Sequence, residues 1–169
     1  GKLAMLLALT HHEYVNKLIV ADIAPVNYPI EKQNIADKLL DLNLDMIKSR
    51  NEADELLSSS IKEKFIRSFL IQNLHLHENK YRWSINLLAI KEAMNDLRSF
   101  PFPEKVEVVN NKTLCVYGQN SDYVSKENLH IFKNIFLNIS FSEIKNAGHY
   151  LHVEQPKEFY NTVRNFLIN

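Results

Sequence analysis

Short apolar runs alternate with helical spacings along the chain, and this pattern predicts an α/β fold. Three runs are expected to form sheet strands, at residues 17–21 (Lys-Leu-Ile-Val-Ala), 113–117 (Thr-Leu-Cys-Val-Tyr) and 139–144 (Ile-Ser-Phe-Ser-Glu-Ile). The first two are mostly apolar, which is typical of parallel strands that are covered on both faces. The third alternates between apolar and polar residues, which favours a position at the edge of the sheet.

Helices are expected before, between and after these strands. Residues 2–11 carry leucine and alanine at helical spacing, and Ser125 can cap a helix whose apolar face includes Phe132. Residues 155–168 place Phe159 and Phe166 on one face of a last helix. The resulting order of elements is that of an α/β domain with a long insert after its first strand.

The insert, residues 30–99, differs in character from the rest of the chain. It is rich in Lys, Glu, Leu, Ile and Asn, its apolar residues recur at helical spacing, and Ser58 to Ser60 could cap a helix that begins at Ile61. We expect three or four helices and no strand here. The predicted organisation is a core over residues 1–26 and 106–169, with a helical cap over residues 27–105.

Composition excludes several classes of protein. The 169 residues include 20 Lys and Arg against 20 Asp and Glu, so a formal charge of zero gives no support for binding to nucleic acid or to a charged membrane surface. The single cysteine, Cys115, rules out an internal disulfide and a cysteine-based zinc site, and it fits a cytoplasmic protein. The spacing of His75 and His77 could suit a metal, but no third ligand is found at a suitable spacing, and we expect a polar loop there.

A histidine lies where α/β sheets place their functional sites. His149 follows the strand at 139–144 and precedes the last helix, so it belongs to a loop at the carboxyl end of a strand. Its imidazole can take a proton from a nucleophile and pass it to a leaving group. In the alternative interpretation, His149 is a surface loop histidine without a role in catalysis. The neighbouring His152 is expected to have a structural or substrate-lining role.

Four segments in the same order resemble the small bacterial acyl esterases of the YbfF type, within the α/β-hydrolases. Residues 1–5 (Gly-Lys-Leu-Ala-Met) resemble the segment after the nucleophile in their Gly-His-Ser-Met-Gly-Gly-Lys elbow. Residues 22–28 (Asp-Ile-Ala-Pro-Val-Asn-Tyr), 82–87 (Arg-Trp-Ser-Ile-Asn-Leu) and 118–124 (Gly-Gln-Asn-Ser-Asp-Tyr-Val) resemble three further motifs, with Asn27 in place of an aspartate. The resemblance covers essentially the whole chain.

This resemblance implies a serine carboxylesterase or acyl thioesterase that acts on acyl ester or acyl-CoA substrates without cofactor or metal. His149 would be the base. We favour Asp22 as the acid, because this group places it there, at the carboxyl end of a strand. The alternative is Asp122, near the position that most α/β-hydrolases use, although the usual spacing there falls on Ser121. Arg82 and Trp83 are candidates for the substrate pocket. In the alternative interpretation they belong to a cap helix, with Trp83 packed on the core and Arg82 in solvent.

The resemblance also implies that the nucleophilic serine lies three residues before Gly1, together with the oxyanion hole. The chain is therefore expected to be the C-terminal part of a hydrolase sheet with its cap, and to be inactive as given. Two alternatives stay open. One is another activity of the same fold, such as a haloalkane dehalogenase, an epoxide hydrolase or a carbon–carbon bond hydrolase. The other is a hydrolase-like binding protein without catalysis.

Overall fold

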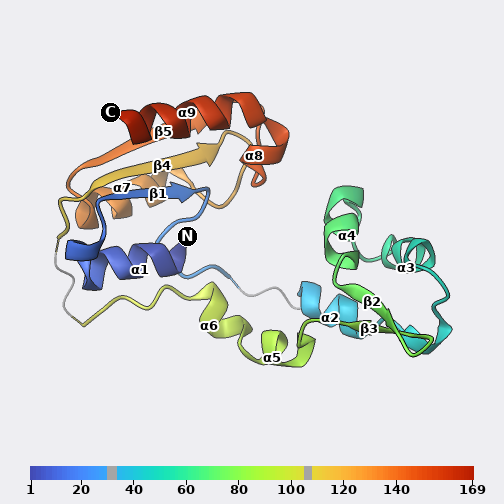
Figure 1. The fold of residues 1–169 in the computed structure, drawn as a ribbon. Coiled ribbons are helices and arrows are strands. Elements are labelled where there is room, and N and C mark those ends of the chain that lie inside the picture. The colour runs from blue at the N-terminus through green and yellow to red at the C-terminus, as the bar shows by residue number, and fades with distance from the viewer. Residues whose placement is uncertain (30–33, 105–107) are drawn as a thin grey trace. The chain divides into compact units, whose positions relative to one another are not determined.

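The computed structural model describes residues 1–29, 34–104 and 108–169, and these form two compact units. The first unit consists of Gly1–Asn27 and Phe100–Asn169, and the second of Tyr28–Ser99 (Figure 1). The predicted division into residues 1–26 with 106–169 and residues 27–105 stays a prediction, and its boundary at 105/106 lies outside the described residues.

The first unit is built on a parallel sheet with the strand order β1-β4-β5 (Figure 1). The strands are β1 (Lys17–Ala21), β4 (Lys112–Gly118) and β5 (Ile139–Ile144). All three lie where the apolar runs predict them, and β4 is one residue longer at each end. Among the described residues β5 pairs with β4 at one end of this sheet, which agrees with its alternating pattern.

Helices accompany the strands as the α/β pattern predicts. The first unit contains α1 (Lys2–Thr10), η1 (His12–Tyr14), α7 (Lys126–Ile135), α8 (Leu151–Glu154) and α9 (Pro156–Ile168). Figure 1 shows α9 on one face of the sheet and α1 on the other. Ser125 caps α7 as expected, because its hydroxyl accepts the amide of Asn128 while the Asn128 side chain accepts the amide of Ser125.

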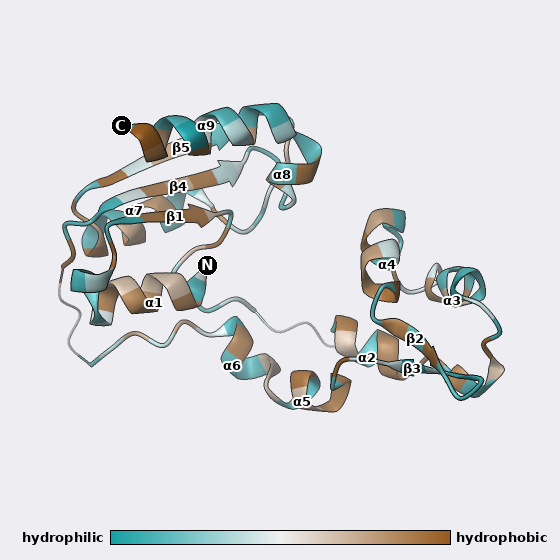
Figure 2. Cartoon of the chain, viewed as in Figure 1, coloured by the Kyte–Doolittle hydropathy of each residue, from teal (hydrophilic) through white to brown (hydrophobic). Residues whose placement is uncertain are grey.

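Apolar burial holds this unit together. Figure 2 shows hydrophobic residues along β1 and β4 and many hydrophilic residues along α9. Val116 on β4, Ile144 on β5 and Phe166 on α9 belong to one buried cluster that also includes Leu151 of α8. Burial of such side chains contributes about 1.5–3 kcal/mol each. The cluster fixes the last helix, and with it the loop that carries His149, against the carboxyl ends of the strands.

The second unit is mainly helical. It contains α2 (Ile35–Leu40), η2 (Leu44–Met46), α3 (Arg50–Leu57), α4 (Lys64–Ile71), β2 (Leu74–His77), β3 (Lys80–Trp83), α5 (Leu87–Glu92) and α6 (Met94–Arg98). Its own apolar cluster is built around Leu39, Leu57 and Leu74. No helix among the described residues of the chain is both long enough and apolar enough to cross a membrane.

The expectation that this insert contains no strand is wrong. β2 and β3 form an antiparallel hairpin in which His75 pairs with Arg82 and Leu74 with Trp83. Glu78 and Asn79 connect the strands with positive φ angles of 49° and 62°, as a two-residue primed turn requires. The strands are only four residues long and the turn lacks the usual glycine, so the sequence carries little hairpin signal. His75, His77, Arg82 and Trp83 are strand residues and belong to neither a loop nor a helix.

The predicted helix start at Ile61 is also wrong. Ser58, Ser59 and Ser60 close α3, because their hydroxyls donate to carbonyls three residues earlier, and α4 begins only at Lys64. The face of α4 that is buried differs from the apolar pattern as well. Phe65 and Phe69 are exposed, while Arg67 is buried.

The burial of Arg67 has a specific cause. Its guanidinium donates to both carboxylate oxygens of Asp54, at 2.9 and 3.1 Å, and to the carbonyls of Ile61 and Lys62. These charge-assisted hydrogen bonds compensate for the removal of the cation from water. They also lower the pKa of Asp54. A polar network, which periodicity does not register, therefore sets the orientation of α4.

Two neighbouring leucines test the packing of the second unit. Leu57→Ala removes a side chain that is 2% exposed and should lower the free energy of unfolding by about 2–5 kcal/mol. Leu56→Ala, at a position that is 51% exposed, should change it by less than about 0.5 kcal/mol. Urea titration followed by the fluorescence of Trp83, the single tryptophan, reports on this unit, since Trp83 packs against the same cluster. Equal losses for the two variants would contradict the assignment of the core.

Candidate active site

Asp22 lies at the carboxyl end of β1 and is the most deeply buried carboxylate among the described residues of the first unit, with 1% of its surface exposed. Its backbone amide donates to the carbonyl of Val116 at 2.8 Å, and its φ angle is 48°. A positive φ is uncommon for a residue with a side chain and indicates a backbone that its surroundings hold in place. The β1–β4 pairing thus aims the carboxylate along the carboxyl edge of the sheet.

Three donors surround this carboxylate. The amide of Gly118 donates to Oδ1 at 3.0 Å, and both the hydroxyl of Ser121 and Nδ1 of His149 contact Oδ2. The distance between Nδ1 and Oδ2 is 2.8 Å. A buried carboxylate needs such partners, because an unpaired charge would be costly to remove from water. The structure therefore brings together His149 and Asp22, which are 127 residues apart in the sequence.

His149 presents the rest of its ring outward. It lies in the loop after β5, and 36% of its side chain is exposed. A carboxylate accepts hydrogen bonds only, so the proton shared with Asp22 belongs to Nδ1, and Nε2 is left as the basic nitrogen. This tautomer is the one that can take a proton from a hydroxyl or thiol group within hydrogen-bond distance of Nε2.

The Glu154 side chain and a close approach at Gly118 hold the histidine loop. The carboxylate of Glu154 accepts the amides of Gly148 at 2.8 Å and of Tyr150 at 3.1 Å. Gly118, at the end of β4, must be a glycine because a Cβ atom there would lie 2.3 Å from the carbonyl oxygen of Gly148. Sequence reasoning missed Glu154. Its only signal was an acidic residue in the short stretch between the histidine and the last helix.

Aromatic rings flank the imidazole. The ring of Tyr123 stacks on His149 with 3.9 Å between centroids and 20° between planes. Tyr150 contacts the same imidazole edge-on, with 5.4 Å between centroids. Neither tyrosine nor the hydroxyl of Ser121 was identified from the sequence as a site residue. Their roles depend on a loop conformation that no local pattern specifies.

Asp122 and His152, the other candidate residues of the first unit, have surroundings of their own. Asp122 is exposed, one residue beyond the hydroxyl that contacts Asp22. His152 is exposed on α8, with its ring centroid 6.1 Å from that of Phe159. Arg82 and Trp83 lie on β3 in the second unit, where Arg82 is exposed and Trp83 packs against the apolar cluster of that unit.

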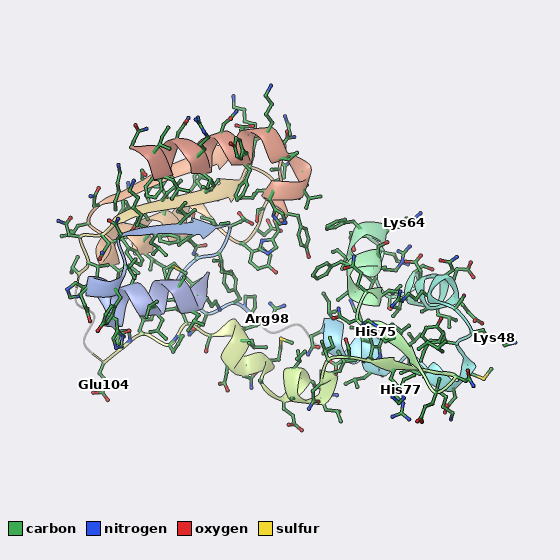
Figure 3. All side chains as sticks on the ribbon, viewed as in Figure 1. Lys48, Lys64, His75, His77, Arg98 and Glu104 are labelled. Carbon is green, nitrogen blue, oxygen red and sulfur yellow. The ribbon has the colours of Figure 1, made fainter. Side chains whose placement is uncertain are left out.

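The histidines of β2 show no metal arrangement. His75 and His77 are both exposed on this strand of the second unit (Figure 3). Within residues 1–29, 34–104 and 108–169, no group of three or more His, Cys, Asp and Glu side chains is placed to hold a metal ion.

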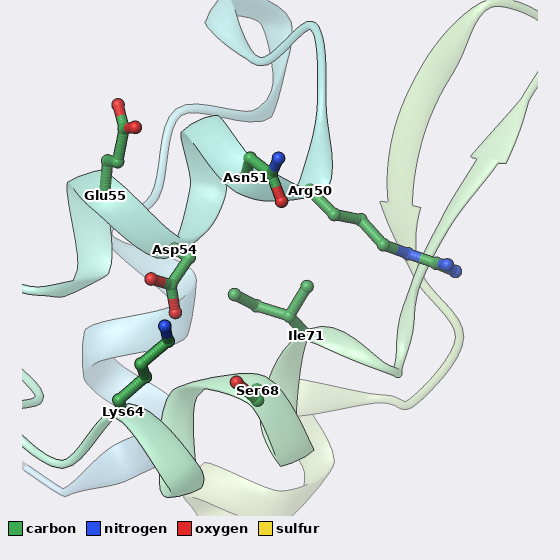
Figure 4. Close-up of a pocket in the computed structure, with 7 residues that line it drawn as sticks. All are labelled: Arg50, Asn51, Asp54, Glu55, Lys64, Ser68 and Ile71. Atoms are coloured by element: carbon green, nitrogen blue, oxygen red, sulfur yellow. The ribbon is translucent and has the colours of Figure 1, made fainter.

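The second unit also contains a cavity of about 470 Å³ between α3 and α4 (Figure 4). It is lined by Arg50, Asn51, Asp54, Glu55, Lys64, Ser68 and Ile71. Two of its charged groups already have protein partners. Arg50 extends away from the other lining residues and donates to the carbonyl of Leu74, and Asp54 pairs with Arg67.

Comparison with known proteins gives relatives over nearly the whole chain. The chain is 32% identical over 173 residues to the sn-1-specific diacylglycerol lipase ABHD11 of Mus musculus, and the match covers 99% of this chain and 56% of that protein. It is 24% identical over 168 residues to Esterase YbfF of Escherichia coli, covering 99% of this chain and 63% of the relative. No protein-family model matches the chain.

A solved structure agrees with these sequence relatives. A marine microorganism esterase superposes with a TM-score of 0.88 at 32% identity, covering 98% of this chain and 66% of that one. The chain therefore belongs to the α/β-hydrolase superfamily. Within the superfamily it resembles the YbfF-type esterases. It spans little more than half the length of the first curated relatives it matches.

Cys115 provides a test of the buried strand behind the site. Burial within β4, with the charge of Asp22 nearby, raises the pKa of its thiol to about 12. The thiolate fraction at pH 8 is then about 10⁻⁴, whereas an ordinary cysteine with a pKa near 8.5 is roughly one quarter ionised. Iodoacetamide should therefore leave native Cys115 unmodified and alkylate it in urea. Mass spectrometry of the peptide measures the labelling, and equal labelling in both conditions would show that this strand is open.

Proposed function

We propose that this chain carries the general base and the acid of a serine hydrolase that cleaves carboxylic esters or thioesters, of the carboxylesterase or acyl-CoA thioesterase type. His149 is the base and Asp22 is the acid. The supporting observation is the 2.8 Å contact between Nδ1 and a carboxylate that is 1% exposed, because this contact orients the imidazole and stabilises its protonated form.

The proposed mechanism uses this geometry. A serine hydroxyl attacks the acyl carbonyl while Nε2 of His149 takes its proton, and the imidazolium then protonates the leaving alcohol or thiol. Water, deprotonated by the same nitrogen, releases the acyl group from the serine. Asp22 remains ionised throughout and stabilises the positive ring. The proposed nucleophile is the serine that the resemblance places three residues before Gly1, so the 169 residues alone are proposed to be inactive.

The substrate is proposed to be a small acyl ester. The names of the relatives, a diacylglycerol lipase and esterases, support ester bonds as the target. We further propose that the second unit forms the cap, that Arg82 and Trp83 on β3 line the acyl or head-group pocket, and that His152 contributes from α8. A cytoplasmic location is proposed on the single, buried cysteine.

Removal of the base is the first test, made in the longer protein that includes the nucleophilic serine. His149→Ala should reduce kcat/KM for a short p-nitrophenyl ester by a factor on the order of 10³ or more, because the variant lacks the imidazole that is proposed to take the proton of the serine. His130→Ala, at an exposed position of α7, is the matched control and should stay close to the native rate. A folded His149→Ala variant with near-native turnover would end the assignment of this residue.

The two candidate acids give the second test. Asp22→Asn should lower kcat in the same protein by a factor on the order of 10³–10⁴, because an amide in this place no longer fixes the required tautomer of His149. Asp122→Asn makes the same chemical change in an exposed side chain. Because Asp122 follows Ser121, which contacts Asp22, it is a matched control, and the substitution should have little effect. If Asp122→Asn proves the more damaging change, the acid has been assigned to the wrong loop.

A further inference from the structure

We infer that Tyr123 is a positioning residue for His149: its ring face holds the imidazole in line with Asp22 and contacts the cation that the imidazole becomes during the reaction. This inference rests on the proposed function for its kinetic consequences but not for the contact itself. The two rings are nearly parallel, at 20°, with 3.9 Å between their centroids. This distance is that of a close stack. The ring of Tyr123 covers one face of the imidazole, and 36% of the His149 side chain remains exposed.

The loop that carries Tyr123 is tied to both members of the pair. Ser121, two residues earlier, donates its hydroxyl to Asp22, and the same hydroxyl oxygen accepts the amide of Tyr123 at 3.2 Å. The next residue, Val124, is buried and anchors the far side of the loop. One short loop therefore contacts the acid through a hydroxyl group and the base through an aromatic ring.

The histidine loop is bound to this same segment. The amide of Gln119 donates to the carbonyl of Ile144 at 3.0 Å, and the amide of Asn120 donates to the carbonyl of Ala147 at 2.9 Å. Because these hydrogen bonds join the two loops at their bases, the stack is not an accidental contact between mobile side chains. The ring of Tyr123 restricts rotation of the imidazole away from the carboxylate.

The stack has an electrostatic consequence as well. The face of an aromatic ring carries negative potential, so a cation that lies over it is stabilised. The imidazole becomes a cation when it takes the proton of the nucleophile, and the ring of Tyr123 is already in contact at that moment. Among the described residues, Asp22, Tyr123 and Tyr150 contact the imidazole directly, and Glu154 binds the backbone amide of the next residue.

Tyr123→Leu in the nucleophile-bearing protein separates covering from stacking, because leucine still shields the imidazole but offers no aromatic face. We expect kcat for the p-nitrophenyl ester to fall about 10- to 100-fold with KM within about 3-fold, since an imidazole that is free to rotate is less often aligned.

Two comparisons isolate the aromatic ring. Tyr123→Phe keeps the aromatic face and should retain most of the native rate. Tyr160→Leu removes an exposed tyrosine from α9 and serves as the matched control for a change of the same kind elsewhere in the unit. If Tyr123→Leu fails to fold, Tyr123→Met makes the same comparison with a longer side chain.

The NMR spectrum of the His149 imidazole, without substrate, distinguishes this inference from the proposed function. In Tyr123→Leu the imidazole ring protons should lose the upfield shift that a stacked aromatic ring produces. If His149→Ala retains full turnover, the proposed function fails while these spectra still decide the contact. Ring-proton shifts and a kcat that both match the native protein in Tyr123→Leu would overturn the inference.

Discussion

The contact between Asp22 and His149 is the interaction on which the arrangement of the first unit depends. It joins a residue at the end of β1 to one beyond β5, across the intervening strand β4, and 127 residues separate them in sequence. Parallel pairing makes this possible, because it collects the carboxyl ends of all three strands at one edge of the sheet. The backbone of Asp22 has a positive φ angle, and position 118 requires a glycine. Both features allow Asp22 and the histidine loop to lie close to each other.

A buried carboxylate at this edge constrains its surroundings further. The amide of Gly118, the hydroxyl of Ser121 and the imidazole of His149 all satisfy Asp22, so loss of any of them would leave an acceptor in a place that water reaches poorly. The same loop that supplies two of these donors also brings Tyr123 onto the imidazole. The acid, the base and their supports are thus a single connected network, and substitutions within it should have coupled effects.

The second unit has a different organisation. A buried guanidinium, Arg67, pairs with Asp54 and ties α3 to α4, and a short hairpin closes the unit beside an apolar cluster. This polar contact leaves Phe65 and Phe69 exposed on the face of α4 that an apolar pattern would bury. The unit therefore combines a conventional core around Leu57 with surface features that helical periodicity does not explain.

The sequence by itself determined the strands of the sheet, the α/β class and the position of His149 after the last strand, because apolar runs and their flanking residues are local signals. It also identified Asp22 and Asp122 as alternatives, with a preference that came from family resemblance. Only the tertiary structure showed which carboxylate contacts the imidazole, since that depends on strand order and register. The hairpin at 74–83, the end of α3 at the serines and the stack of Tyr123 on His149 were likewise decided by packing. Each of these features depends on contacts or hydrogen bonds that no local sequence pattern specifies.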